Sequence, residues 1–285
     1  MKQVRELSIQ KNKSLKNRFF KWETLLALIL LVVCLGLKVM APEIVSFGGL
    51  VENSMVFIDK GIIVLSMMLI LVIGEIDISV GSIACLSSVI MATLYNQGVP
   101  FTGALVIAML VGIICGGFNG FIVTYFKELA PMIVTLATMT IYRGIAYIIL
   151  GDTSCGGFPS WFSNLGWGYL TENLSIPINL TVFLVIAAGF YVVMHHTITG
   201  KRIFAIGTNQ IASEYNGIHV KRIKWTLYTI NGFMSALAGI FLMARLGSAR
   251  PNVALGYELD VIAMCVLGGV STAGGKGSVI GVVLS

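Results

Sequence analysis

The sequence predicts an all-α protein that crosses a membrane as a polytopic helical bundle. Of the 285 residues, 56% are hydrophobic and only 11% are charged, so charged side chains are too few to cover a water-soluble surface. Backbone polar groups in hydrocarbon must be satisfied within the protein, and long apolar runs without strand-like alternation satisfy them as helices. The 32 glycines suit helices that pack closely inside a membrane.

At about 20 apolar residues for each crossing, the chain has room for about eight spans and their loops. We expect a basic cytosolic N-terminal segment over residues 1–23 and a transmembrane domain over residues 24–285. The expected spans are 24–40, 55–74, two spans between 78 and 126 that are divided at 96–100, 131–150, 178–194, 226–244, and two apolar pieces at 259–269 and 279–284. All six prolines lie at or near these boundaries, as expected of a residue that breaks helices.

Positive charge is concentrated beside apolar runs, and this asymmetry orients a membrane protein. Seven of the 19 lysines and arginines precede Trp22, and five more flank the polar stretch 197–225. Because basic residues stay on the cytoplasmic side, we expect both segments there, with membrane lipid rather than nucleic acid as their partner. Residues 151–177 contain no lysine or arginine, so we expect them outside.

Residues 197–225 form the longest polar and cationic interruption of the apolar sequence. An intermittent apolar stripe includes Phe204 and Ile211, and Gly207 and Gly217 break it. The pattern predicts a short amphipathic helix between two glycine hinges. A simple connection would need neither feature, so we expect this coupling loop to dock on a cytosolic partner that supplies force. Its candidate residues are Gly200, Lys201, Arg202, Phe204, Gly207, Asn209, Ala212 and Gly217.

Two carboxylates, Glu75 and Asp77, lie between two apolar spans with few polar neighbours. An ionised carboxylate near hydrocarbon costs about 2.5 to 3.5 kcal/mol on insertion scales, so such groups normally face a cavity, a partner or water. Flanking glycines allow a broken helix, in which these two residues, Ser79 and Gly81 form a hinge or line a pathway. The alternative is an interfacial turn with Asp77 as the N-cap of the next helix. The residues alone leave both open.

Further polar residues are candidates for the same pathway. Glu258 and Asp260 repeat the order Glu-apolar-Asp before a helix of small residues, which is either an internal repeat, as in many transporters, or a coincidence. Asn119 could hydrogen-bond a sugar hydroxyl or, more simply, a neighbouring helix. Arg143 is a base within the apolar run 131–150, and it could bind a ligand or a carboxylate, or extend to the lipid headgroups.

We expect no catalytic, cofactor or metal site in the chain. The glycine-rich stretch 268–278 invites comparison with a phosphate-binding loop, but Val270 and Gly277 occupy the positions where that loop requires glycine and serine or threonine. The five cysteines occur singly, and the sequence contains no metal-binding or hydrolase motif. Any ATP hydrolysis must therefore come from another subunit.

Three stretches together resemble the permease subunits of bacterial ABC importers for ribose and related monosaccharides. Residues 74–82 resemble the signature Gly-Gly-Ile-Asp-Leu-Ser-Val-Gly, with Glu75 replacing the second glycine. Residues 200–220 are similar to the coupling loop of that family, and residues 257–278 match its third block. The blocks occur in the family order and span most of the chain from the second expected span onward.

The resemblance implies a multi-pass permease of the bacterial inner membrane with a cytoplasmic N-terminus. It implies a second permease copy, identical or different, a cytosolic ABC ATPase subunit that binds ATP and Mg²⁺, and an extracytoplasmic sugar-binding protein. Ribose, rhamnose, a furanosyl autoinducer and a nucleoside are all compatible substrates. Family members usually continue beyond the glycine-rich turn, so we expect that the chain, which stops at Ser285 in an apolar run, is truncated.

Two other classes stay open. In an ion-coupled secondary transporter, Glu75, Asp77 or Asp260 would bind protons or sodium ions, and uptake would need no ATPase. In a non-transporting remnant, the chain would move no solute even with its partners.

Overall fold

The computed structural model describes residues 22–170 and 176–285, and the secondary structure in these ranges is helical. The elements are α2 (Trp22–Met40), α3 (Phe47–Val72), α4 (Val80–Asn96), α5 (Phe101–Tyr125), α6 (Pro131–Leu150), η1 (Ser160–Ser163), α7 (Asn164–Trp167), α8 (Ile178–His196), α9 (Ile198–Thr208), α10 (Gln210–Tyr215), α11 (Val220–Leu246), α12 (Tyr257–Leu267) and α13 (Val279–Leu284). Most of the predicted basic segment, residues 1–21, lies outside the described residues.

Six helices in the described ranges are long and apolar enough to cross a membrane, namely α2, α3, α5, α6, α8 and α11. The predicted all-α polytopic bundle is confirmed. α4 is a shorter apolar helix of 17 residues. The two apolar pieces expected at 259–269 and 279–284 are the short helices α12, of 11 residues, and α13, of 6 residues. At about 1.5 Å per residue, neither reaches across the roughly 30 Å of a hydrocarbon core.

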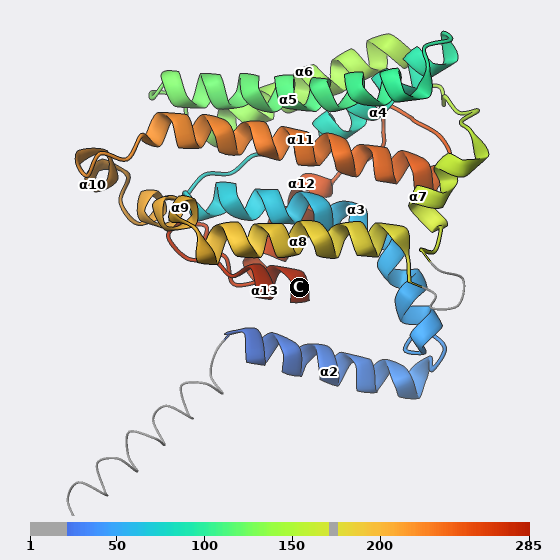
Figure 1. The fold of residues 1–285 in the computed structure, drawn as a ribbon, viewed down its shortest axis with the longest axis horizontal. Coiled ribbons are helices and arrows are strands. Elements are labelled where there is room, and N and C mark those ends of the chain that lie inside the picture. The colour runs from blue at the N-terminus through green and yellow to red at the C-terminus, as the bar shows by residue number, and fades with distance from the viewer. Residues whose placement is uncertain (1–21, 171–175) are drawn as a thin grey trace, which may run out of the picture.

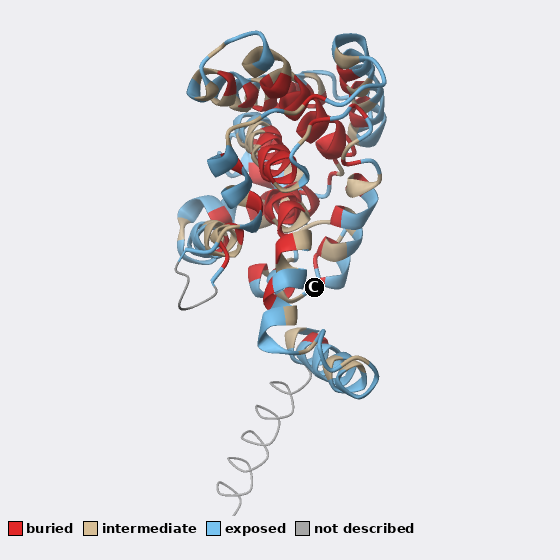
Figure 2. Cartoon of the chain, turned by 90° about the vertical axis from the view of Figure 1, so that its right-hand side faces the viewer, coloured by how far each residue is buried: buried red, intermediate tan, exposed pale blue. Residues whose placement is uncertain are grey.

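Helices α3 and α11 form the centre of the bundle (Figure 1). α11 lies between α5 and α3 and also packs on α4. Every residue of α3 from Ile62 to Val72 is buried, and Figure 2 shows the buried residues gathered in the same central layer. A helix that is apolar on all sides is stable in this position because its neighbours cover every side.

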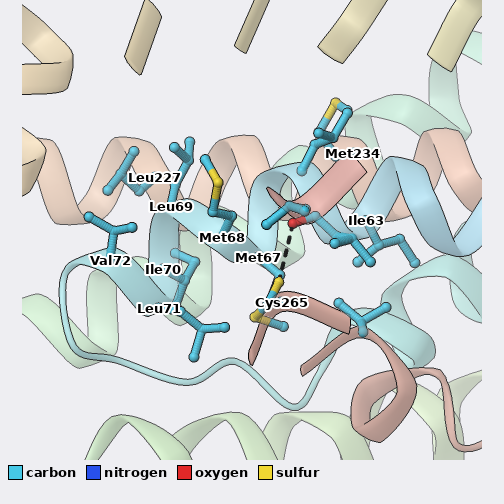
Figure 3. Packing of buried hydrophobic residues seen from close by; sticks show 14 of the residues in the cluster. Ile63, Met67, Met68, Leu69, Ile70, Leu71, Val72, Leu227, Met234 and Cys265 are labelled. Carbon is cyan, nitrogen blue, oxygen red and sulfur yellow. Dashed lines mark hydrogen bonds between the residues drawn. The ribbon is translucent and has the colours of Figure 1, made fainter. Parts of the chain in front are cut away.

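The close-up in Figure 3 shows how other helices cover α3. Leu227 and Met234 of α11 belong to the same buried cluster as Met67 and Met68 of α3. From α12, the Cys265 thiol donates a hydrogen bond to a backbone carbonyl of α3 at 3.5 Å. Because lipid tails are as apolar as these side chains, van der Waals packing rather than the hydrophobic effect holds the helices together.

Glycine lets α5 and α11 approach closely where they cross. A Cβ on Gly116 would overlap the backbone of Tyr228 and Gly232, and a Cβ on Gly232 would overlap the backbone of Gly112 and Gly116. Small residues of this kind permit backbone-to-backbone contact between membrane helices. The high glycine content therefore serves close packing at this crossing, as composition predicts.

Helix α2 lies apart from the main bundle (Figure 1). Leu26 is its one buried residue. The indole Nε1 of Trp22 donates to the Leu267 carbonyl at 2.7 Å, and α2 also packs on α13. The remaining sides of α2 are apolar and exposed, which suits contact with lipid.

We expect Gly232→Val to disturb the crossing of α5 and α11, because the added side chain overlaps the backbone of Gly112 and Gly116. Overpacking typically costs about 1–3 kcal/mol, so the midpoint of thermal unfolding, measured in detergent by size-exclusion chromatography after heating, should fall. Gly144→Val on α6 is the matched control, because a Cβ there meets nothing within 4 Å. Equal midpoints for the two variants would contradict this account of the crossing.

Candidate functional site

The chain between α3 and α4, residues 73–79, is a non-helical segment inside the bundle. Glu75 is 8% exposed, and Asp77 and Ser79 are fully buried. The alternative of an interfacial turn with Asp77 as N-cap is therefore wrong, because helices cover the segment and the N-cap of α4 is Ser79. A break at this position leaves backbone groups that the protein itself must satisfy.

Asp77 ties this segment to the two central helices. Its Oδ1 accepts hydrogen bonds from the backbone N–H and the hydroxyl of Ser79, at 2.9 and 2.6 Å. Its Oδ2 accepts from Nδ2 of Asn231 on α11 at 2.9 Å. The Oδ1 of Asn231 in turn accepts from the Ser66 hydroxyl on α3 at 2.7 Å. One buried carboxylate thus has three donors from the segment itself and from α11.

The network continues to α5 and α6. The Ser79 hydroxyl accepts from Nδ2 of Asn119 at 2.7 Å, and Oδ1 of Asn119 accepts from the Tyr142 hydroxyl at 2.9 Å. The Thr135 hydroxyl accepts from the Ile78 N–H at 3.2 Å. Asn119 therefore bonds to neighbouring elements, which is the simpler of its two predicted roles. Hydrogen bonds that support one another in a dry interior are strong, so the network fixes where α4 begins.

A second non-helical segment, residues 247–256, connects α11 to α12, and Ala249, Pro251 and Ala254 within it are buried. Arg143 of α6 donates to the carbonyl oxygens of Pro251 and Val253, and the Cys85 thiol of α4 donates to that of Pro251 at 3.1 Å. Arg143 therefore binds backbone carbonyl groups of segment 247–256, a role that the sequence did not suggest.

The two breaks meet at the N-termini of α4 and α12. A Cβ on Gly81, in the first turn of α4, would overlap the Ala254 carbonyl and the Glu258 carboxylate. Glu258 is buried, and its Oε2 has no hydrogen-bond partner within the described residues. It lies in the first turn of α12, whereas Glu75 precedes α4. The repeated order Glu-apolar-Asp therefore does not mark equivalent positions in two structural repeats.

Charged side chains join α3 to α11 and α12 in the middle of α3. Asp59 accepts from the Tyr257 hydroxyl at 2.6 Å and pairs with Arg245 at 3.3 Å. Lys60 pairs with Asp260 at 2.6 Å. Each carboxylate thus has a cation beside it, as expected of charges in apolar surroundings. Sequence reasoning predicted Asp260 for the pathway but singled out neither Arg245 nor Tyr257.

Sequence reasoning also missed Asn231 and Lys224. For Asn231 the sequence did contain an indication. Asn231 is an uncharged polar residue within the apolar run of α11, which is the same signal that selected Asn119. Lys224 looked like one more cation of the coupling loop, and its sequence gives no sign of a buried partner.

The predicted coupling loop contains two helices, α9 and α10, rather than one. Asn209 separates them, and its Oδ1 caps α10 by accepting from the Ala212 N–H at 2.9 Å. Gly217 follows α10 with a φ of 78°, a left-handed conformation that glycine adopts without strain. Gly207 lies within α9, so the prediction that it is a hinge is wrong.

Gly207 is instead the point where the coupling loop touches the end of α3. A Cβ on Gly207 would overlap the Val72 carbonyl and the Gly275 N–H. That N–H donates to the same Val72 carbonyl at 2.8 Å. The glycine-rich turn 268–278 is therefore a packing element that joins α9 to the beginning of segment 73–79.

The inner side of α9 packs on the bundle. Gly200 is buried, and a Cβ there would overlap the Met194 carbonyl. Ile203 and Ile206 are buried as well, and Phe204 packs against the same core. The part of the predicted apolar stripe that lies on α9 thus anchors this helix, whereas Ile211 of the same stripe does not.

The outer side of the coupling loop is exposed. Ile211 and Tyr215, one turn apart on α10, are 68% and 89% exposed, and Ala212 lies beside Ile211. Lys201 and Arg202 of α9 are exposed too. Apolar side chains that protrude beside cations are typical of an interaction surface. We call Ile211, Ala212 and Tyr215 the α10 surface.

Glu75 forms a buried ion pair with Lys224, near the start of α11. The pair lines a cleft of about 540 Å³ whose other walls come from the α5–α6 connection, including Lys127, and from the α9–α10 junction, including Asn209. The charge by which this chain departs from the family signature is therefore compensated by a cation from another helix.

The two breaks, which precede α4 and α12, meet inside an apolar bundle, and an exposed helical surface lies at one end of it. These are features of a polytopic membrane transport protein. Residues 50–285 match the model of the family described as branched-chain amino acid transport system / permease component. The chain belongs to this family. The predicted resemblance to permease subunits of ABC importers is confirmed, and membership makes the chain a permease component of a transport system.

Named relatives are similar over nearly the whole chain. The autoinducer 2 import system permease protein LsrD of Salmonella paratyphi A is 32% identical over 274 residues, which cover 94% of this chain and 81% of the relative. LsrD of Yersinia enterocolitica is 33% identical over 275 residues, with 94% and 82% covered. LsrD of Escherichia coli SMS-3-5 is 30% identical over 272 residues, with 93% and 81% covered. No solved structure matches.

We expect Asn231→Leu to destabilise the protein, because it removes a donor to Asp77 and the acceptor of Ser66. Hydrogen bonds to a charged group contribute about 1.5–3 kcal/mol, so the midpoint of thermal unfolding in detergent should fall. Asn53→Leu makes the same change at an exposed position of α3, where the amide donates to the Gly49 carbonyl. Its midpoint should stay near that of the wild type, and an equal fall in both variants would argue against the network.

Proposed function

We propose that the chain is the membrane permease of an ATP-driven importer in which a cytosolic ATPase docks on the α10 surface. Family membership supports the class. In this proposal residues 24–285 form the transmembrane domain, residues 197–225 are its coupling loop, and ATP and Mg²⁺ bind to the ATPase. The exposed apolar side chains of α10 supply the docking contact.

The observation that carries this proposal is the contact of α9 with the end of α3. Helix α10 protrudes at one end of the bundle (Figure 1), and α9 packs through Gly207 on the Val72 carbonyl. Val72 immediately precedes segment 73–79. A displacement of α10 by a partner would therefore reach the buried network around Asp77 through backbone contacts.

Backbone that packs this tightly transmits a displacement because no side chain can rearrange to absorb it. Movement of segment 73–79 would shift the N-terminus of α4, where Gly81 contacts Glu258 of α12. A pathway between the two broken helices would then open alternately to the two sides of the membrane.

The charge distribution supports a cytoplasmic position for the α10 end, because basic residues stay on that side. The cations near this end are Lys127, Lys201, Arg202, Lys221, Arg222, Lys224 and Lys276. Trp22 bonds to Leu267 near the same end, which supports a cytoplasmic N-terminus.

The substrate in this proposal is a small polyhydroxylated solute that an extracytoplasmic binding protein delivers. A second permease copy, identical or different, completes the transporter. The relatives from Salmonella and Yersinia are named for autoinducer 2 import. That name favours a furanosyl solute of this kind over ribose, rhamnose or a nucleoside.

Ala212→Asp tests the docking of the ATPase, because it places a charge in the exposed apolar α10 surface. ATP-driven uptake of autoinducer 2 by proteoliposomes that contain the permease, the ATPase and the binding protein should fall at least about tenfold, the change that a loss of about 1.4 kcal/mol of docking free energy produces. Membrane insertion and thermal unfolding should not change, since Ala212 is exposed.

Glu214→Gln is the matched control, because it alters the charge of α10 by one unit on the side opposite Ala212. Its uptake should match that of the wild type. Unimpaired uptake by Ala212→Asp would remove the docking claim. Uptake driven by an ion gradient without the ATPase would show a secondary transporter, and absence of uptake by the complete wild-type system would show a non-transporting chain.

Gly207→Ala tests transmission separately from docking. The added Cβ cannot coexist with the Val72 carbonyl and the Gly275 N–H, so α9 must move away from the end of α3. We expect the assembled complex to hydrolyse ATP while the number of solute molecules moved per ATP falls severalfold. Gly189→Ala on α8, where a Cβ meets nothing within 4 Å, should keep the wild-type ratio. A normal ratio in Gly207→Ala would refute transmission through this contact.

A further inference from the structure

A second cavity, of about 350 Å³, opens between α5 and α11 at the α10 end of the bundle. Three aromatic side chains, Phe121, Tyr125 and Trp225, and two cations, Lys221 and Arg222, line it. Thr124 and Lys221 also line the neighbouring cleft of Glu75 and Lys224. The three rings and Arg222 line only this cavity of the two, so its composition needs a separate explanation.

The charges of the two cations are not compensated by an acidic side chain among the described residues. Lys221 and Arg222 form no ion pair in the part of the chain that the structure describes, whereas Lys224 pairs with Glu75. The Lys221 ammonium lies 5.6 Å from the centroid of the Tyr125 ring, a cation–π contact that holds the charge beside the cavity. An anion is the ligand that would compensate both cations.

Thr124 gives a second and independent indication of a ligand. It lines the cavity and is 3% exposed, and its Oγ1 has no hydrogen-bond partner among the described residues. Buried hydroxyls are normally hydrogen-bonded, because leaving one unpaired is costly. A phosphate oxygen in the cavity would accept this hydrogen bond.

The aromatic side chains indicate where the anion comes from. Phe121, Tyr125 and Trp225 are about half exposed, and aromatic rings near the end of a membrane bundle lie at the depth of the lipid headgroups. The Trp225 Nε1 already donates to the Gly117 carbonyl at 2.9 Å, so this ring acts as a fixed apolar wall. A phospholipid fits both parts of the cavity, with its phosphate near the cations and its acyl chains against the rings.

We propose that this cavity binds the phosphodiester headgroup of an anionic phospholipid. Lys221 and Arg222 compensate the phosphate charge, and the Thr124 hydroxyl donates to a phosphate oxygen. Basic pockets between membrane helices bind acidic headgroups in this way. Both cations lie at the start of α11, in the last part of the coupling loop, so the lipid steadies the helix to which α10 is connected.

Fluorescence quenching of the full chain in lipid nanodiscs tests the proposal without any transport assay. The probes are brominated phosphatidylglycerol and brominated phosphatidylcholine, each diluted into unlabelled phosphatidylcholine. The quenching that Trp225→Phe removes is the signal of the cavity. We expect that signal to reach half of its maximum at a clearly lower mole fraction of the brominated phosphatidylglycerol than of the brominated phosphatidylcholine.

Variants locate the effect at the cavity. The double variant Lys221→Gln/Arg222→Gln should weaken the apparent affinity for brominated phosphatidylglycerol at least about fivefold, and Thr124→Val should weaken it as well. The control Lys201→Gln/Arg202→Gln removes the same charge from exposed positions of α9 and should keep the preference. An equal loss in both double variants would overturn the site, because it would show only a general attraction to the membrane.

Three further outcomes would overturn the proposal. Equal quenching of Trp225 by the two lipids would show no preference for an anionic headgroup. Displacement of brominated phosphatidylglycerol by millimolar inorganic phosphate or glycerol phosphate would show that the site takes a free anion. Absence of quenching by either lipid would show that protein, such as a second copy of the chain, covers this face.

Discussion

The need to satisfy backbone polar groups inside an apolar bundle governs this structure. Helices α4 and α12 begin within the bundle, so the segments that precede them, residues 73–79 and 247–256, cannot rely on water alone. Asp77 and its partners satisfy the first segment, and Arg143 satisfies carbonyls of the second. The position of each break therefore depends on side chains from other helices, and the whole bundle decides where the chain is broken.

The network around Asp77 and the contact between α4 and α12 differ in how firmly they are held. Asp77 accepts three hydrogen bonds, and its network reaches α3, α5, α6 and α11. Where α4 meets α12 at Gly81, the Glu258 Oε2 has no partner within the described residues. Separating α4 from α12 would break fewer hydrogen bonds than pulling segment 73–79 from its network. The contact between the N-termini of α4 and α12 is thus the weaker joint of the two.

The helices could be predicted because each apolar run carries its own signal, and a break such as 96–100 is marked by polar residues and proline. The site could be predicted only in part. Asp77 stood out as a carboxylate in an apolar sequence, but its partner Asn231 is 154 positions away, and no local pattern pairs them. At Gly207 the sequence shows only that a side chain is missing. The structure shows that the Val72 carbonyl fills the space, and so a predicted hinge is a close contact.

Glu75 illustrates how a chain accommodates a charge that its family signature lacks. A lone carboxylate at this position would be costly, and Lys224 of α11 compensates it within a cleft that both residues line. Removing one member of a buried pair leaves an uncompensated charge, whereas exchanging both for apolar residues is often tolerated, so the two positions depend on each other. Lys224 lies in the last part of the coupling loop, at the start of α11. That loop is therefore joined to segment 73–79 at two places, through the backbone contact at Gly207 and through an ion pair that Glu75 adds.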